Sequence, residues 1–162
     1  MDGARKFGFP PIFDKDSRVL ILGSFPSVKS RAIDFYYGNK QNRFWKLICG
    51  YFGEEIPQST EGKKDFLKRR KIALWDMVES CEIQGSQDAT VKKEEIVDLQ
   101  QVLCQANIEC ILLNGKLAFS LFLREYKDLC VTYKCMPSTS PANPYFDESV
   151  WREALDDVFK TR

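Results

Sequence analysis

Four short apolar runs that alternate with stretches of helical periodicity constrain the fold of this 162-residue chain more than any other feature. The runs are rich in β-branched residues and leucine, as buried strands are, and they cover residues 19–22, 72–75, 108–113 and 130–133. Strands that alternate with helices are most easily joined by right-handed crossovers into a parallel sheet covered on both faces. The pattern therefore predicts an α/β fold, a three-layer α/β/α sandwich around a central four-stranded parallel sheet.

Apolar residues at helical spacing indicate where the helices lie. The expected helices span residues 42–52, 64–70, 92–105, 115–126 and 147–159. The first presents Phe44 and Trp45 on an apolar face, and the second is short and basic. Thr90 lies just before the third helix and Asp147 begins the last one, and both residue types are favoured helix caps.

The composition limits the classes of protein to which the chain can belong. At 162 residues and 44% apolar content, it can bury one sizeable core, so we expect a single domain over residues 1–162. A mean hydropathy of -0.34 and the lack of any apolar run near about eighteen residues argue against a membrane span. Residues 1–13 do not resemble a secretory signal. We expect an intracellular protein, cytoplasmic or, in a eukaryote, nuclear.

The cysteines suggest a reducing compartment. They are Cys49, Cys81, Cys104, Cys110, Cys130 and Cys135. None forms a C-x-x-C pair and most have apolar neighbours, so we interpret them as buried thiols. A scattered four-cysteine iron–sulfur site is the less favoured alternative, because the ligands of such sites are usually clustered. We expect no metal and no cofactor.

The absence of histidine excludes several kinds of catalysis. Ser-His-Asp and Cys-His mechanisms, H-E-x-x-H zinc sites and any imidazole acid or base are ruled out. Carboxylates, amides, hydroxyls and backbone dipoles remain. The net charge of +1 provides no general attraction to nucleic acid, so any contact with DNA must be local.

The candidate site lies where three loops leave the predicted sheet. In parallel sheets, ligands bind beyond the carboxyl ends of the strands. The loops with unusual chemistry at those ends cover residues 23–42, 76–88 and 136–144. The first combines a tight glycine–proline turn with aromatic residues and an asparagine that leads into a helix, which favours a pocket for a flat ring.

The ordered motifs resemble one enzyme family. They are the strand and turn of residues 19–27, Tyr36-Tyr37-Gly38 before Asn42-Arg43-Phe44-Trp45, Leu74-Trp75-Asp76 followed by Gly85-Ser86-Gln87-Asp88, Leu113-Asn114-Gly115-Lys116, and residues 137–143. Each motif is modest alone, but the set in this order resembles the uracil-DNA glycosylase superfamily and, within it, the hypoxanthine-DNA (deoxyinosine) glycosylase branch. The resemblance spans almost the whole chain.

The resemblance implies a monofunctional DNA N-glycosylase. Such an enzyme flips a deaminated base out of DNA, here hypoxanthine and, as a further candidate, uracil, and hydrolyses its N-glycosidic bond to leave an abasic site. No cofactor is needed, because prepositioned dipoles stabilise the charge that develops. The implied partner is double- or single-stranded DNA, and we expect a monomer without a membrane association.

The resemblance also assigns the catalytic residue. Many relatives carry Asn or Asp at the third position of the first motif, where the side chain orients the attacking water. Here that position is Phe25, which cannot do so. In the deoxyinosine branch the catalytic asparagine lies in the segment matching Asn42, and an amide oxygen is an adequate acceptor for water. The alternative is that Asn42 only caps the helix that begins at Arg43.

The predicted substrate-binding residues are Gly23, Ser24, Phe25, Pro26, Ser27, Tyr37, Asn39 and Asp76. Tyr37 matches a position that stacks on the flipped base, with core packing as the alternative. Gly23 would let the backbone N–H of Phe25 approach a base carbonyl. An ionised Asp76 would accept a hydrogen bond from a ring N–H, unless it is only a cap.

The chain departs from the family pattern at Asn39-Lys40-Gln41, where relatives have a His-Pro-Arg-like stretch. Asn39 is interpreted as a turn residue, with a polar contact to substrate as the alternative. Because of this departure and of Phe25, a second class of function stays open. It is a glycosylase-like protein that binds nucleic acid without chemistry.

The third loop resembles the second superfamily motif, which presses on DNA while the base is out. Its predicted DNA-binding residues are Ser138, Thr139, Ser140, Pro141, Ala142 and Asn143. Hydroxyl and backbone donors would bind phosphate, and Met136 or Ala142 would serve as an apolar wedge. The basic run over residues 63–71 is interpreted as a solvated helix face, with DNA contact as the alternative.

Overall fold

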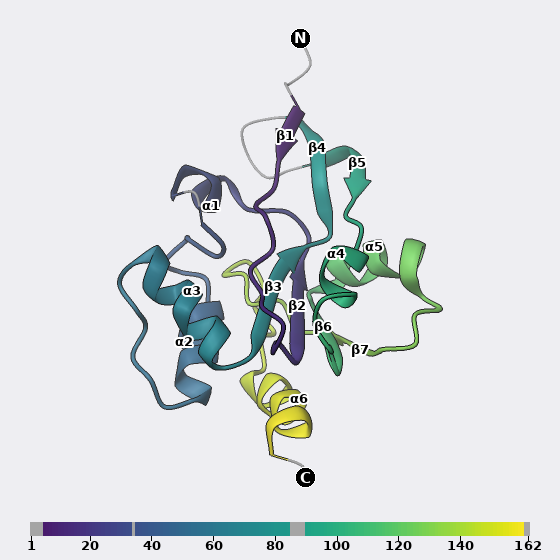
Figure 1. Ribbon diagram of the computed structural model, residues 1–162. Helices are drawn as coiled ribbons and strands as arrows, with labels where there is room; N and C mark the ends of the chain where they lie inside the picture. Colours follow the sequence, from purple (N-terminus) through teal and green to yellow (C-terminus); the bar gives the residue numbers. More distant parts are fainter. Residues whose placement is uncertain (1–4, 34, 85–89, 161–162) are drawn as a thin grey trace.

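The computed structural model describes residues 5–33, 35–84 and 90–160 (Figure 1). A four-stranded sheet with helices on both faces forms its centre, and all neighbouring strands of this sheet are parallel. Its strands, in spatial order, are β3 (Ile72–Asp76), β2 (Val19–Gly23), β6 (Cys110–Asn114) and β7 (Thr132–Met136). The predicted parallel sheet and three-layer α/β class are therefore confirmed.

The burial of the strands explains why the sequence shows them clearly. All five residues of β2 and all five of β3 are buried, so each strand is a continuous apolar run and does not alternate. The edge strand β7 is mostly half-buried or exposed, and it ends at Met136, three residues later than predicted. Its polar residues blur the strand boundary, because only one of its faces needs apolar side chains.

The helices form two layers around this sheet. They are α1 (Val28–Ile33), α2 (Phe44–Tyr51), α3 (Thr60–Arg69), α4 (Gln100–Leu103), α5 (Lys116–Tyr126) and α6 (Glu148–Phe159). In Figure 1, α2 and α3 lie to the left of the sheet, and α4 and α5 lie to its right. The hydroxyl of Tyr51 donates to Asp156 at 2.6 Å, which joins the end of α2 to α6.

The predicted helix over residues 92–105 is wrong. Thr90, expected to cap that helix, instead begins strand β5 (Thr90–Ile96), which pairs with β4 (Val78–Gln84). Together with β1 (Arg5–Phe7) they form a second, antiparallel sheet in the order β1-β4-β5. The lysines and glutamates of β5 favour helix locally, but pairing with β4 overrides that preference. Only Gln100–Leu103 is helical in this region.

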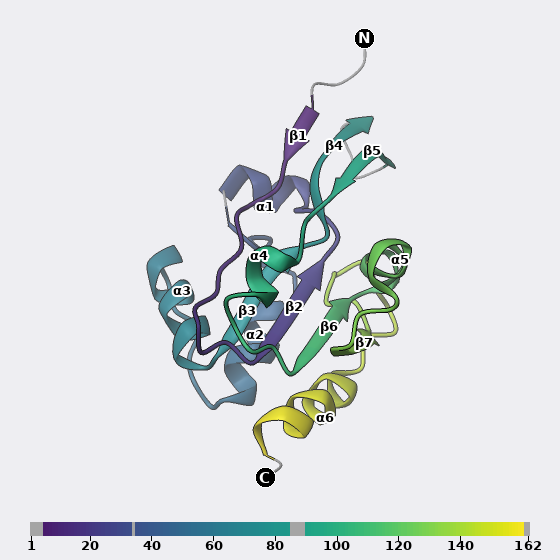
Figure 2. The ribbon, with the colours of Figure 1, turned by 45° about the vertical axis from the view of Figure 1, so that its right-hand side comes forward.

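The second predicted loop is mostly strand. Met77 alone separates β3 from β4, so the chain runs almost directly from the parallel sheet into the antiparallel one (Figure 2). The N–H of Met77 donates to the Gly23 carbonyl at 2.7 Å, and that of Val78 donates to the Ser24 carbonyl at 3.0 Å. The Gly85-Ser86-Gln87-Asp88 motif lies outside the described residues.

The outer edge of β3 is covered by the N-terminal segment. Ile12 and Leu74 exchange two backbone hydrogen bonds of 2.9 Å in an isolated antiparallel bridge. Pairing of this kind removes part of a free strand edge, which would otherwise be a template for association. No helix in the described parts of the chain is long and apolar enough to cross a membrane.

The prediction that the cysteines are buried holds for half of them. Cys49, Cys81 and Cys110 are buried, whereas Cys104, Cys130 and Cys135 are exposed. The exposed thiols lie after α4 and on or before β7, where the chain passes along the surface. Apolar neighbours in the sequence therefore did not suffice to predict burial at the edge of the sheet.

Candidate active site

A cavity of about 420 Å³ opens at the carboxyl ends of β2, β3 and β6. The predicted residues that line it are Gly23, Ser24, Phe25, Pro26, Ser27, Tyr37, Asn39, Asn42, Asp76, Ser138, Thr139, Ser140, Pro141 and Ala142. Asn143 does not line it. Further lining residues that the sequence did not suggest are Ser30, Arg31, Tyr36, Asn114 and Leu117. The three predicted segments thus meet in one place.

Gly23 allows the floor of the cavity to close. Gly23 and Asp76 are neighbours across the β2–β3 pair. A Cβ at position 23 would lie 2.5 Å from the Asp76 Oδ1 atom and 2.9 Å from the hydroxyl of Tyr37, closer than real Cβ contacts occur. The glycine therefore makes room for two side chains of the site, and the approach of the Phe25 N–H to a base carbonyl stays a prediction.

Asp76 is buried at this floor, with 5% of its surface exposed. Burial raises the pKa of its carboxyl group to about 7, although a hydrogen bond from the backbone of Gly23 opposes this shift. Near neutral pH the group is thus present in both protonation states. The ionised form only accepts hydrogen bonds, whereas the protonated form also donates one, so Asp76 has more capacity than the carboxylate predicted from the sequence.

Tyr37 is held in place from two directions. Its ring stacks on Phe44 with centroids 4.2 Å apart, and its hydroxyl accepts a hydrogen bond from Asn114 at 3.1 Å. Burial and the nearby Asp76 raise the pKa of Tyr37 far above its usual range, so the phenol stays neutral. Core packing therefore occupies one face of the ring, and only the part that lines the cavity is left for a base.

The backbone at Tyr37 is left-handed, with a φ of 51°. This conformation is uncommon for a residue with a side chain. The following residue, Gly38, stabilises the turn by donating its N–H to the Ser30 hydroxyl at 3.0 Å. The turn directs Tyr37 towards the end of β2.

Asn42 makes a cap-like contact and also lies at the cavity, and its catalytic role stays a prediction. Its Oδ1 atom accepts the N–H of Phe44, the first residue of α2, at 2.9 Å, which resembles a helix cap. Asn42 also lines the cavity. An amide oxygen has two lone pairs, so the bond to Phe44 orients the side chain and leaves capacity for a water.

Asn39 forms a turn before this helix. Its Oδ1 atom accepts the N–H of Gln41 at 3.0 Å, and its carbonyl accepts the N–H of Asn42 at 2.9 Å. The first contact is the pattern of an Asx turn, as the favoured interpretation of Asn39 proposed. The altered segment of residues 39–41 therefore still positions Asn42.

Asn114 connects the parts of the site, although the sequence did not indicate it as a site residue. Its side-chain nitrogen donates to the hydroxyls of Tyr37 at 3.1 Å and Thr139 at 3.0 Å. Its side-chain oxygen accepts the N–H of Thr139 at 3.0 Å. The available signal was its position, because Asn114 ends β6 in the same way that Gly23 and Asp76 end their strands.

Arg43 fixes the start of α2 to the third loop. Its N–H donates to the carbonyl of Thr139 at 3.0 Å, and its Nη1 atom donates to the carbonyl of Ser140 at 2.9 Å. The guanidinium also lies 4.9 Å from the centroid of the Phe146 ring. Asn42 and the loop of residues 138–142 thus keep a defined separation.

The third loop uses its backbone donors internally. The N–H groups of Ser140 and Ala142 donate to the hydroxyls of Ser138 and Ser140, each at 3.1 Å, and that of Asn143 donates to the Ser140 carbonyl at 3.0 Å. These N–H groups are therefore already occupied within the loop, and the binding of phosphate by the loop stays a prediction. Both serine hydroxyls act here as acceptors, so their protons remain available for donation.

Of the two alternatives for an apolar wedge, Met136 is excluded by its burial. Met136 is only 2% exposed, because it is the last residue of β7 and pairs with Asn114 in the sheet. A side chain held there cannot reach between base pairs. Ala142 is exposed on the loop, and its role as an apolar wedge stays a prediction.

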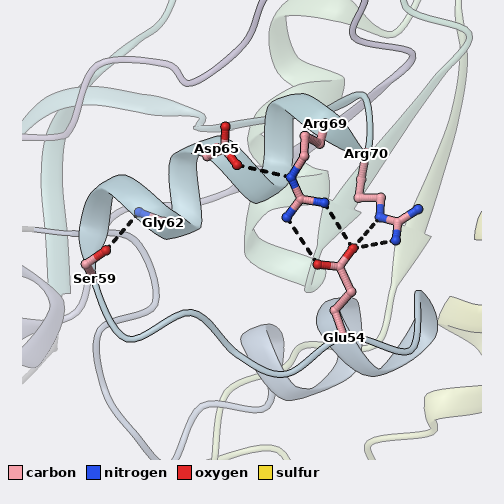
Figure 3. Close-up of polar contacts among 6 residues, drawn as sticks. All are labelled: Glu54, Ser59, Gly62, Asp65, Arg69 and Arg70. Carbon is pink, nitrogen blue, oxygen red and sulfur yellow. Dashed lines mark hydrogen bonds and ion pairs between the residues drawn. The ribbon is translucent and has the colours of Figure 1, made fainter.

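The basic run has its arginines paired with acids at the end of α3 (Figure 3). Glu54 accepts hydrogen bonds from Arg69 at 3.1 and 3.2 Å and from Arg70 at 2.7 Å. Asp65 accepts a further bond from Arg69 at 3.0 Å. These pairs support the interpretation of the run as a helix face. Lys64 and Lys68 line a second cavity, also of about 420 Å³.

Comparison with known proteins places this arrangement in a family. The sequence model of the Uracil DNA glycosylase superfamily matches residues 10–158. The chain belongs to this superfamily. The predicted family, with its class of enzyme, a DNA N-glycosylase with DNA as the substrate, is thereby confirmed.

Individual relatives agree with the family match. The chain is 36% identical over 157 residues to a protein of Methanosarcina acetivorans named hypoxanthine DNA glycosylase, covering 90% of this chain and 95% of the relative. A Methanosarcina barkeri protein of the same name is 37% identical over 114 residues, 69% of this chain and 72% of the relative. A solution NMR structure of a Methanosarcina acetivorans protein classed with the uracil DNA glycosylases superimposes with a TM-score of 0.83 at 33% identity, covering 95% of this chain and 98% of that one.

Proposed function

We propose that this glycosylase removes hypoxanthine from deoxyinosine in DNA and leaves an abasic site. The observation that carries the choice of a deaminated base is Asp76, a buried carboxyl group at the floor of the cavity. Deamination of adenine converts ring nitrogen N1 from an acceptor into an N–H donor, and deamination of cytosine does the same at N3. An ionised carboxylate accepts from such an N–H and repels the lone pair of the undamaged base. The names of the two Methanosarcina relatives support the purine as the preferred base.

The chemistry needs no ionisable catalyst. As the bond between C1′ and the base nitrogen breaks, its electron pair leaves with the base and the sugar becomes oxocarbenium-like. A water held by the side-chain oxygen of Asn42 then adds to C1′ and releases its proton to solvent, and the departing base takes up a proton. The contribution of Asn42 is position, because the amide cannot accept the proton itself.

The surrounding residues hold the substrate in this scheme. The cavity side of Tyr37 contacts the base, and the hydroxyls of Ser138 and Ser140 donate to the DNA backbone. The protein acts as a monomer, as one domain over residues 1–162, and inside the cell where its DNA substrate lies. The family match over residues 10–158 supports the single domain.

A cleavage assay tests the proposal. Labelled single- and double-stranded oligonucleotides with inosine, uracil, xanthine or a thymine mismatch are incubated with excess protein, and abasic sites are cleaved with alkali. We expect inosine to be cleaved fastest. Binding without cleavage of any oligonucleotide would support the alternative, a glycosylase-like binding protein.

The role of Asn42 is tested in the same assay. Asn42→Ala should lower the single-turnover rate by about 100-fold or more, the size of effect seen when one positioned polar group is removed from an active site. Asn107→Ala is the matched control, since Asn107 is an exposed amide before β6, at the end of the sheet opposite the cavity, and its effect should be much smaller. A retained rate in Asn42→Ala would show that another group holds the water.

A further inference from the structure

Arg31 is a charged residue of the cavity wall to which the chemistry above gives no task. Among the described residues that line the cavity, Arg31 is the one cationic side chain, and Asp76 is the one acidic side chain. Arg31 lies on the short helix α1, which follows the turn after β2. The net charge of the chain is +1, so attraction of DNA to this cavity depends on local charges of this kind.

The guanidinium of Arg31 is held from one side. Its Cζ atom lies 5.7 Å from the centroid of the Phe25 ring, and its Nε atom donates to the carbonyl of Pro26 at 3.4 Å. Its two terminal nitrogens donate to no residue in the parts of the chain that the structure describes. The contacts therefore orient the group while its fork of N–H donors stays available.

The substrate offers one kind of anion to this fork. The base and the deoxyribose are neutral, whereas a phosphodiester flanks the nucleotide on each side. Guanidinium groups bind phosphate through two parallel hydrogen bonds, which restrict both position and orientation. The loop of residues 138–142 contributes only neutral hydroxyls, and Arg69 and Arg70 are already paired with Glu54.

We propose that Arg31 binds a phosphodiester next to the flipped nucleotide, and that Phe25 supports it by packing against the guanidinium. This inference rests on the proposed function, because it needs a nucleotide in the cavity. It gives Phe25 a task at the motif position where many relatives hold the water. Arg31 positions the nucleotide in the substrate complex and in the abasic product, so it acts on affinity more than on the chemical step.

The experiment compares Arg31→Gln and Arg31→Lys with the unaltered protein. Affinities for an inosine duplex and an abasic-product duplex are measured by fluorescence anisotropy over a range of salt concentrations. Arg31→Gln should weaken both by about 10- to 100-fold, the range for a hydrogen-bonded charged group, and should lower the salt dependence by about one phosphate contact. Arg31→Lys keeps the charge without the fork and should recover part of the affinity.

A set of duplexes with a single neutral methylphosphonate identifies the phosphate. At one flanking position the substitution should weaken the unaltered protein and leave Arg31→Gln unaffected, because the contact is already lost. Lys15→Gln is the charge control. Lys15 precedes β2, at the end of the sheet opposite the cavity, and its side chain is 83% exposed. This variant should bind like the unaltered protein, and thermal melting checks that all variants fold.

Two outcomes would overturn the inference. One is an affinity and salt dependence of Arg31→Gln equal to those of the unaltered protein. The other is a difference in affinity between the unaltered protein and Arg31→Gln that stays the same on every methylphosphonate duplex. That result would mean that Arg31 contacts no phosphate. Failure of the proposed function is a separate result, since it would appear as absent cleavage by the unaltered protein, while the binding comparison can still be made.

Discussion

Replacement of Asp76 by asparagine should change how stability depends on pH. Burial raises the pKa of Asp76 from its ordinary value of 3.8 to about 7 in the folded protein. The unfolding free energy is therefore lowered at any pH at which Asp76 is ionised in the unfolded chain, because burial disfavours the charged form in the folded protein. A group with a raised folded pKa contributes its full stability below the unfolded pKa, and that stability is lost as the pH rises through the folded pKa.

The magnitude follows from the two pKa values. At about 1.36 kcal/mol for each pKa unit, the difference between 3.8 and about 7 corresponds to a maximal loss of about 4 kcal/mol in unfolding free energy. Between about pH 4.5 and about pH 8, the unaltered protein should lose about 3 kcal/mol through this one group. Asparagine has the same shape, still accepts the Gly23 N–H and carries no charge, so Asp76→Asn should lack this loss.

Urea unfolding followed by tryptophan fluorescence measures the effect. The stability of Asp76→Asn minus that of the unaltered protein should rise by about 3 kcal/mol over this pH range, on top of a constant offset from the new amide. Asp147→Asn is the matched control, because hydrogen bonds from Ser149 lower the pKa of this exposed helix cap. The stability difference for Asp147→Asn should therefore stay nearly flat over this pH range, because the advantage of the acid is lost only as the pH falls below about 4. The reasoning would be refuted if the stability difference between Asp76→Asn and the unaltered protein stayed constant or fell as the pH rises. That result would mean that the folded protein does not raise the pKa of Asp76.

The remaining predictions concern the groups that hold the cavity together. Asn114→Ala removes the hydrogen bonds to Tyr37 and Thr139 and should lower the unfolding free energy by about 2 to 3 kcal/mol. Cleavage should also become slower. An unchanged stability in urea would contradict the role of Asn114 in connecting the parts of the site. Gly23→Ala should cost about 1 to 3 kcal/mol through crowding and impair cleavage, both measured as above. Its control is Gly50→Ala in α2, where the new Cβ meets nothing closer than Arg152 at 3.9 Å and should slightly stabilise the helix; equal effects of the two substitutions would refute the crowding argument.

The sequence predicted those elements whose own residues specify them. Strands β2 and β3 are buried on both faces, and Asp147 caps α6 with a bond from the Ser149 N–H. Strand β5 was missed because its Lys-Lys-Glu-Glu centre carries no strand signal of its own, and its structure depends on a partner strand. Local propensity cannot report such pairing.

In the candidate site, too, some features could be predicted from the sequence and others depend on contacts between distant residues. The ends of parallel strands meet at one edge of the sheet, so Gly23 and Asp76 could be brought together by reasoning from topology. The same reasoning places Asn114 at this edge, but its bonds to Tyr37 and Thr139, 77 and 25 positions away, are carried by no local pattern. The buried state of Asp76 likewise follows only from tertiary packing, whereas the N–H groups of Ser140 and Ala142 bond to hydroxyls two residues earlier in the same loop.

The direct passage of β3 into β4 makes the floor of the cavity and the antiparallel sheet one mechanical unit. Asp76 ends β3, and the Gly23–Ser24 turn is bonded to the backbone of Met77 and Val78. Displacement of the β4–β5 pair is therefore transmitted through the main chain to the residues at the floor of the cavity, without any side chain as an intermediate. Sequence variation in β4 and β5 can thus change the geometry of the floor while the residues that line the cavity stay the same.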